Sequence, residues 1–138
     1  MSIQSLNPYI NFEGNAEKAI RHYERTLGAK VERLVRYREV PNSNFPRELE
    51  DKVMHCELRI GDGVVMVSDA SPQMCHVGGA SQVALHFSDD ADLTAKFESL
   101  GQDGKTLFPI HDTWYGGKFG MLTDAFGVRW MFNRNPRS

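Results

Sequence analysis

The sequence predicts an α+β fold in which two tandem βαβββ modules form a cupped sheet around a cleft. The order strand, helix and three strands is found twice along the 138 residues. Each predicted helix has apolar residues at helical spacing, and the predicted strands alternate apolar and polar side chains. We therefore treat residues 1–138 as a single domain with an internal repeat of residues 1–70 and 81–135.

The first copy opens with a strand expected at residues 6–12, whose two faces carry different side chains. Gly14 breaks this strand, and Asn15 is expected to cap the helix that follows. Gly28 ends the helix, whose apolar positions are Ala16, Ala19, Ile20, Tyr23 and Leu27. Further strands are expected at residues 30–40, 53–60 and 64–69, with a tight turn at 61–63.

The second copy follows a glycine- and proline-containing linker at residues 71–80. A strand is expected at 81–88, and Asp89 or Asp90 is expected to cap a helix that ends near Gly101 or Gly104. Three strands are expected around residues 106–108, 119–122 and 128–133. A shift of 75 residues superimposes the two copies, placing Phe12 on Phe87 and Ala16 on Ala91.

Composition excludes several classes of protein. Hydrophobic residues make up 41% and charged residues 25%, as in ordinary globular domains. A net charge of −2 argues against a nucleic-acid partner, and no apolar run reaches the roughly 20 residues of a membrane span. The first residues lack a signal-peptide pattern, and Cys56 and Cys75 form no CxxC pair, so we expect a cytoplasmic protein with free thiols.

One face of each predicted sheet is too polar to belong to a core. The apolar face of each sheet is expected to pack under its helix, whereas the opposite face carries polar groups that are costly to bury. Two such faces turned inward would line a cleft, which we interpret as a binding site. The polar residues concerned are Asn7, Tyr9, Asn11, Gln82 and His86.

Three blocks of sequence resemble one known superfamily. They are residues 8–15, residues 53–69, and a C-terminal block that runs from Trp114 through Phe119-Gly120-Met121, Thr123-Asp124 and Phe126-Gly127-Val128 to Trp130-Met131. Together they resemble the vicinal-oxygen-chelate superfamily of glyoxalase I, extradiol dioxygenases, and fosfomycin and bleomycin resistance proteins, in its PhnB-like branch. The resemblance implies the paired βαβββ fold and, commonly, a homodimer.

The resemblance also bears on metal binding. Metal-dependent relatives bind a divalent ion through His or Glu on the first and last strands of each half. Here the corresponding positions read Asn7, Val67, Gln82 and Met131, which cannot form a hard-cation site. We therefore predict no metal at the usual positions and do not transfer glyoxalase or dioxygenase activity. No glycine-rich loop with an acidic partner supports the methyltransferase description attached to some PhnB-like sequences.

His55 and Glu57 are the candidate catalytic residues. They lie two apart on a predicted strand and so share its polar face, opposite Cys56 and Leu58. They are suited to act as a general base with an orienting carboxylate, or as two ligands of a displaced metal site completed by His86. The alternative is a set of polar groups hydrogen-bonded across the sheet.

The candidate ligand-binding residues are Tyr9, Asn11, Gln82, His86, Trp114 and Arg129. Tyr9 and Asn11 either orient a ligand or bond across strands, and Arg129 either pairs with an anionic substrate or with Glu57 or Asp69. Trp114, next to two glycines, is either a lid over a bound molecule or part of the core. Asp69 is either a cleft acid or a turn former, and we favour the turn. His111 either contributes to the mouth of the cleft or lies in a loop, and we favour the loop.

These observations predict a cytoplasmic PhnB-like protein that binds a small organic molecule between its two halves. Whether it is an enzyme is left open. Catalysis of a proton-transfer or lyase-type reaction would use His55 and Glu57. The alternative is a non-catalytic protein that sequesters its ligand, as in antibiotic resistance.

Overall fold

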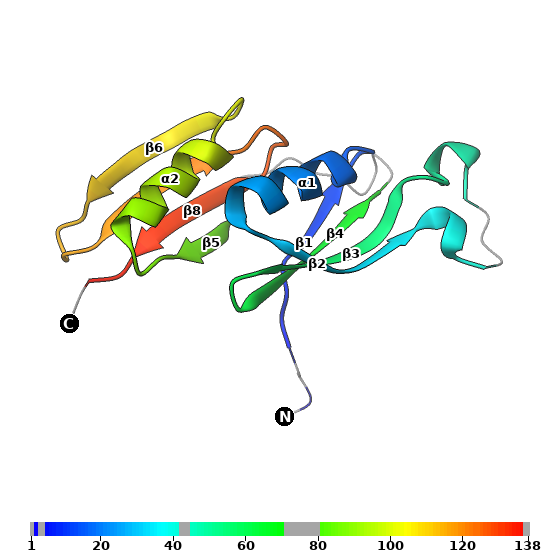
Figure 1. The fold of residues 1–138 in the computed structure, drawn as a ribbon, viewed down its shortest axis with the longest axis horizontal. Helices are drawn as coiled ribbons and strands as arrows, with labels where there is room; N and C mark the ends of the chain where they lie inside the picture. The colour runs from blue at the N-terminus through cyan, green and yellow to red at the C-terminus, as the bar shows by residue number, and fades with distance from the viewer. Residues whose placement is uncertain (1, 3–4, 42–44, 71–80, 137–138) are drawn as a thin grey trace. The chain divides into compact units, whose positions relative to one another are not determined.

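The computed structural model describes residues 2, 5–41, 45–70 and 81–136, and these fall into two compact units, Met1–His76 and Val77–Ser138 (Figure 1). Each unit contains one helix and one four-stranded mixed sheet in the order strand, helix and three strands. The predicted α+β class with two tandem βαβββ modules is confirmed. The predicted linker, residues 71–80, lies outside the described residues.

The first unit contains strands β1 (Tyr9–Phe12), β2 (Lys30–Arg36), β3 (Val53–Ile60) and β4 (Gly63–Asp69), with helix α1 (Ala16–Leu27). The sheet order is β1-β4-β3-β2, with β1 parallel to β4 and the other pairs antiparallel. Helix α1 packs on β3 and β4 (Figure 1). Its fully buried residues meet apolar strand residues to form a core that includes Ile20, Tyr23, Cys56, Leu58 and Val67.

The second unit contains β5 (Val83–His86), helix α2 (Asp90–Leu100), β6 (Lys105–Asp112), β7 (Lys118–Thr123) and β8 (Arg129–Arg134). Its sheet order is β5-β8-β7-β6, so β5 and β6 are the edges. Helix α2 packs on β8 (Figure 1). The ring of Phe132 stacks on Phe87 at 5.3 Å and meets Phe97 edge-on at 5.1 Å, so aromatic packing forms much of this core.

Several strand boundaries differ from the expectation, among them those of β5, which spans Val83–His86 and not residues 81–88. Strand β1 begins at Tyr9, and Leu6 is 89% exposed, because the ladder with β4 starts at the pair Tyr9 and Met66. Strand β2 ends at Arg36, where a short 3-10 helix, Tyr37–Glu39, follows. Strand β6 continues to Asp112 through Pro109. An edge strand tolerates this proline because the ladder is irregular there and needs no N–H.

The start of α1 corrects two predictions. The side chain of Asn15 makes no capping hydrogen bond. Instead Asp69 Oδ1 accepts from the N–H groups of Gly14 and Ala16, each at 2.9 Å, and Asp69 Oδ2 accepts from Val53 N–H at 3.0 Å. Asp69, expected as a turn former, is therefore a buried carboxylate at the end of β4 that caps the helix from another element.

Helix α2 begins as predicted, since Asp89 Oδ2 accepts from Asp92 N–H at 2.8 Å. The superposition by 75 residues is less successful inside the helices, because Ala16 is fully buried and Ala91 is exposed. Among the described residues, no helix is long and apolar enough to cross a membrane.

Candidate functional site

The face of the first sheet opposite α1, here called the first open face, holds the candidate catalytic pair. Cross-strand register puts Tyr9, Met66, Glu57 and Arg33 in one row across all four strands. In β3 the residues of the other parity, including Cys56 and Leu58, are fully buried under α1. The alternation of the strand therefore places His55 and Glu57 on the open face, as predicted.

His55 and Glu57 are in direct contact. The distance between His55 Nε2 and Glu57 Oε2 is 3.3 Å, and the two side chains are 22% and 31% exposed. A carboxylate only accepts, so the imidazole donates its Nε2–H and keeps a lone pair on Nδ1 when it is neutral. The arrangement is that of a general base whose ring is oriented by a carboxylate.

Two predicted ligand-binding residues share this face. The ring of Tyr9, which is 51% exposed, lies 6.0 Å from the ring of His55. Asn11 has the same parity as Tyr9 and lies opposite Ser68 in the ladder. Asn7 is engaged structurally, because its Nδ2 donates to the Val64 carbonyl at 2.9 Å. The structure thus brings Tyr9, Asn11, His55 and Glu57 to one face of one sheet.

The corresponding face of the second sheet, the second open face, carries another row of side chains. The register places His86 opposite Asn133, Asn133 opposite Phe119, and Phe119 opposite His111. Asn133 Nδ2 donates to Asn135 Oδ1 at 2.8 Å and lies 3.2 Å from His86 Nδ1. Because that nitrogen of Asn133 is a donor, His86 Nδ1 accepts, and the neutral ring carries its proton on Nε2.

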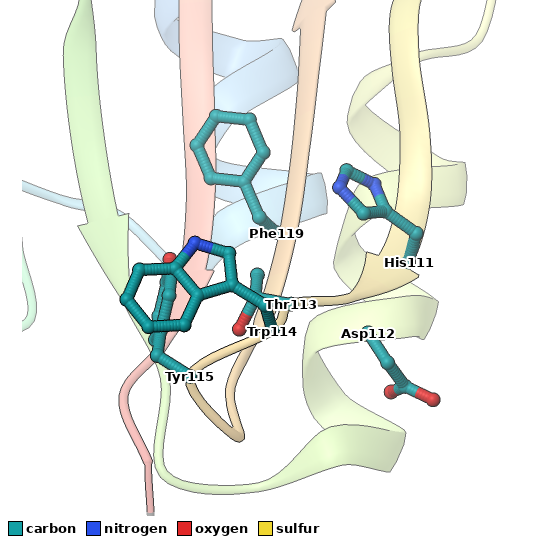
Figure 2. A pocket seen from close by; sticks show the side chains of 6 residues that line it. All are labelled: His111, Asp112, Thr113, Trp114, Tyr115 and Phe119. Carbon is teal, nitrogen blue, oxygen red and sulfur yellow. The ribbon is translucent and has the colours of Figure 1, made fainter.

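A pocket of about 460 Å³ lies at the end of the β6–β7 hairpin (Figure 2). Strand β6 and the turn supply one part of its wall and Phe119 of β7 another. In Figure 2 the His111 ring points towards Phe119, whereas the Asp112 carboxylate points away from the aromatic rings. The lining residues are His111, Asp112, Thr113, Trp114, Tyr115 and Phe119.

Trp114 is part of this pocket and not of the core. Its side chain is 95% exposed, which excludes the core-packing alternative, while the other tryptophan, Trp130, is fully buried. The Trp114 and Tyr115 rings are perpendicular, 5.4 Å apart. The turn is fixed by two hydrogen bonds of Thr113 to the backbone of Gly117, where a Cβ would lie only 2.4 Å from the Arg134 carbonyl oxygen.

The remaining predicted residues are less informative. Gln82 is exposed just before β5, and Arg129 lies on β8 opposite Thr123. Asp69, one of the predicted partners of Arg129, is occupied by three backbone N–H groups of the first unit. Gln82 and Arg129 are not among the described residues that line the hairpin pocket.

Of the residues that line the hairpin pocket, Trp114 was predicted to bind a ligand, whereas Tyr115 and Phe119 were not. His111 was expected in a loop, but it belongs to β6. This part of the strand was not predicted because it contains Pro109, and proline normally argues against strand structure. The strand extends to Asp112 because it pairs with β7 up to Lys118, a contact that local sequence does not show.

Comparison with known proteins identifies the family. The sequence profile of the Glyoxalase/Bleomycin resistance protein/Dioxygenase superfamily matches residues 5–132. The chain belongs to this superfamily. Protein YjdN of Escherichia coli is 33% identical over 141 residues, covering 93% of both chains. An uncharacterised Mycobacterium bovis protein, Mb0911c, is 32% identical over 96% of this chain and 84% of its own.

Solved structures of the superfamily have the same fold. Protein PA1353 from Pseudomonas aeruginosa superimposes with a TM-score of 0.83 at 29% identity, over 98% of this chain and 100% of that one. A Bacillus cereus PhnB protein, described as a putative 3-demethylubiquinone-9 3-methyltransferase, gives 0.77 at 24% identity, over 95% and 99% of the two chains. The second likeness shows the fold alone.

In metal-dependent relatives, the resemblance places the metal ligands on the first and last strands of each half. Among residues 5–41, 45–70 and 81–136, no three His, Cys, Asp or Glu side chains gather as a metal site would require. His55 and Glu57 lie in the first unit and His86 in the second, so neither unit by itself holds the displaced set. Val67, one of the positions compared with the metal ligands of relatives, is buried with Val65 and Asp69, whereas Met66 and Ser68 have the open-face parity.

Burial also defines what Cys56 does. Desolvation under α1 raises the pKa of the Cys56 thiol to about 11, so the side chain stays protonated at neutral pH. A protonated, fully buried thiol is a poor nucleophile and a poor metal ligand. Cys56 is therefore a core residue and not a candidate nucleophile.

Proposed function

We propose that this superfamily member binds a small organic molecule and transfers a proton to or from it through His55. The observation that carries the proposal is the 3.3 Å contact between His55 Nε2 and Glu57 Oε2 on the face of the first sheet opposite α1. Glu57 orients the ring and stabilises the imidazolium that forms, while Nδ1 takes the proton.

The ligand is held by groups beside the base. Tyr9 supplies a half-exposed ring 6.0 Å from His55, and Asn11 supplies an amide on the same face. A carbon acid such as a 2-hydroxyketone or a β-keto acid offers a hydrogen acidic enough for an imidazole base, together with oxygens for these polar groups. Gln82, His86 and Arg129 are proposed as further ligand-binding residues of the second unit.

The test follows solvent deuterium into a panel of 2-hydroxyketones and β-keto acids by proton NMR. We expect His55→Ala to lower the exchange rate of a turned-over compound by about 100-fold or more, which is the usual contribution of a general base. Glu57→Gln should lower it less, while binding is retained in both. Glu32→Gln, which alters an exposed carboxylate paired with Arg59, is the matched control. Full exchange in His55→Ala would contradict the proposal.

The second candidate function is sequestering without catalysis. The observation that favours it is the hairpin pocket of the second unit, which is lined by aromatic rings and lacks the histidine–carboxylate contact of the first unit. A sequestering protein should lose affinity in Trp114→Ala and be unaffected by His55→Ala. Tight binding with no deuterium exchange in any bound compound would favour this function.

We further propose that the protein is a cytoplasmic homodimer, on the strength of the family resemblance. Light scattering at micromolar concentration should give about twice the chain mass of 15.6 kDa. A monomer mass would contradict this proposal and would leave the proposal for His55 unaffected, because that contact lies within one unit of one chain.

A further inference from the structure

We propose that the hairpin pocket of the second unit binds a flat aromatic molecule through an N–H donor directed at His111 Nε2. The proposal depends on ligand binding by the second unit and not on proton transfer at His55. It specifies a class of ligand from three features of the pocket: its rings, its volume and the protonation state of one histidine.

The rings define the shape of the ligand. Trp114 is 95% exposed and Tyr115 is 42% exposed, and their rings are perpendicular. Such an indole offers a free face for stacking, while Phe119 and His111, also nearly perpendicular to each other with centroids 6.0 Å apart, supply further ring surface (Figure 2). A planar ring gains most from such a lining, and about 460 Å³ accommodates a small organic ligand.

His111 defines the polar group of the ligand. Its Nδ1 lies 2.9 Å from the carbonyl oxygen of Pro109. A carbonyl oxygen can only accept, so Nδ1 carries the proton and the neutral ring presents a lone pair at Nε2. The ring points towards Phe119 in Figure 2, so this acceptor belongs to the pocket.

Two other polar side chains of the pocket, Thr113 and Asp112, are already engaged. Thr113 Oγ1 accepts from Gly117 N–H at 2.9 Å. Asp112 pairs with Lys118 at 2.7 Å and points away from the rings. The hydrogen bond from Lys118 also lowers the pKa of the Asp112 carboxyl, so that group stays ionised and bound to its lysine. Among His111, Thr113 and Asp112, His111 therefore offers the acceptor to which we assign the N–H group of the ligand, while Trp114 and Tyr115 add an N–H and an O–H group to the lining.

The test compares indole with benzofuran, which has nearly the same flat shape but an oxygen in place of the N–H. The readout is the side-chain N–H signal of Trp114 in a proton–nitrogen spectrum of the whole chain, since the protein has only two tryptophans. The second signal, from Trp130, serves as an internal reference because its Nε1 is bound to Asp124 in the core.

We expect indole to bind at least threefold more tightly than benzofuran and to shift the Trp114 signal. His111→Phe should keep a ring in place but abolish the difference between the two probes, and Trp114→Ala should weaken both by at least tenfold. Phe108→Ala is the matched control, because Phe108 is an exposed aromatic of the same strand that does not line the pocket.

Equal binding of the two probes, or a preference for indole that survives His111→Phe, would overturn the role of His111. Absence of any shift of the Trp114 signal with either probe would overturn the pocket as an aromatic site. Because none of these results involves His55, the deuterium-exchange test of the proposed function keeps its own outcome.

Discussion

In each unit, a charged side chain at the end of the last strand contacts the start of the helix. This side chain is an aspartate in the first unit and an arginine in the second. In the first unit the carboxylate of Asp69 accepts from two N–H groups at the start of α1. In the second unit the strand supplies Arg134, whose Nε donates to Asp90 of α2 at 2.6 Å. Both contacts hold an acid at a helix N-terminus, where the dipole favours negative charge, but the acid comes from the strand in one unit and from the helix in the other.

This difference explains why the repeat is hard to see in the sequence. The fold requires a complementary pair at this junction, but not a particular residue on either side of it. Two halves can therefore share the order of their elements and their helix-capping chemistry with little sequence identity. The two units thus each place an acidic side chain at the start of the helix but hold it by different contacts, backbone N–H groups in the first unit and an ion pair in the second.

The largest expected effect comes from removing the acid of the first junction. Asp69→Ala leaves three backbone N–H groups without their partner, and each costs about 1–3 kcal/mol when it is buried, so we expect a loss of about 4 kcal/mol. Urea unfolding followed by circular dichroism measures this loss. Asp69→Asn, which keeps one acceptor oxygen, should lose less. A loss below about 1 kcal/mol in Asp69→Ala would contradict the capping role.

The second junction should be weaker. The side chains of Arg134 and Asp90 are 10% and 37% exposed, so Asp90 can turn to water when its partner is removed. We expect Arg134→Met to lose about 1–2 kcal/mol, between the values for exposed and buried ion pairs. A double-mutant cycle with Asp90→Asn isolates the pair. Coupling near zero would show that the two junctions are not equivalent interactions.

The next effect concerns the ion pair between Glu17, on the solvent side of α1, and Arg36, and it is measured as the free energy of unfolding at several pH values. Hydrogen bonds from Arg36 lower the pKa of Glu17, whose side chain is 42% exposed. Because the pKa of Glu17 is lower in the folded state, this contact stabilises the folded state at pH values above about 4.5, the ordinary value for glutamate. The contribution disappears as the pH falls through the pKa of the folded state. Exposure limits the effect to about 0.5 kcal/mol. The stability difference between wild type and Glu17→Gln should shrink below pH 4.5, and a difference that grew there would be contrary to expectation.

The smallest effect on stability is expected from Trp114→Ala. A side chain that is 95% exposed contributes almost nothing to the core, so the free energy of unfolding should change by less than about 0.5 kcal/mol. Acrylamide should quench one tryptophan readily in the wild-type protein and leave only the protected Trp130 in the variant. A large loss of stability would mean that Trp114 packs in the folded protein.

Much of the fold followed from alternation and helical spacing. Strand β3 was predicted with both its ends, and so was the side of that strand on which His55 and Glu57 lie, because the period of two leaves little freedom once Cys56 and Leu58 are buried. The edges were less predictable. Strands β1 and β6 lie at sheet edges, where pairing on one side alone decides how far the ladder extends.

The parts that sequence reasoning missed depend on contacts between distant residues. Nothing near Asn15 indicates that Asp69, 54 positions later, caps the helix in its place. Similarly, the sequence predicted equally well that Trp114 is a lid or a core residue, because the exposure of its side chain depends on where the hairpin ends relative to Phe119. Local patterns specify a face of an element, whereas the partner across that face is fixed only by tertiary structure.

His55 of the first open face and His111 of the second differ in the ring nitrogen that carries the proton. A long-range proton–nitrogen spectrum of the histidine side chains at pH 8, where an ordinary imidazole is neutral, reads the tautomer of each ring directly. We predict that His55 holds its proton on Nε2, facing Glu57, with a free lone pair on Nδ1, and that His111 holds its proton on Nδ1. A His55 ring protonated on Nδ1 would contradict the assigned contact with Glu57.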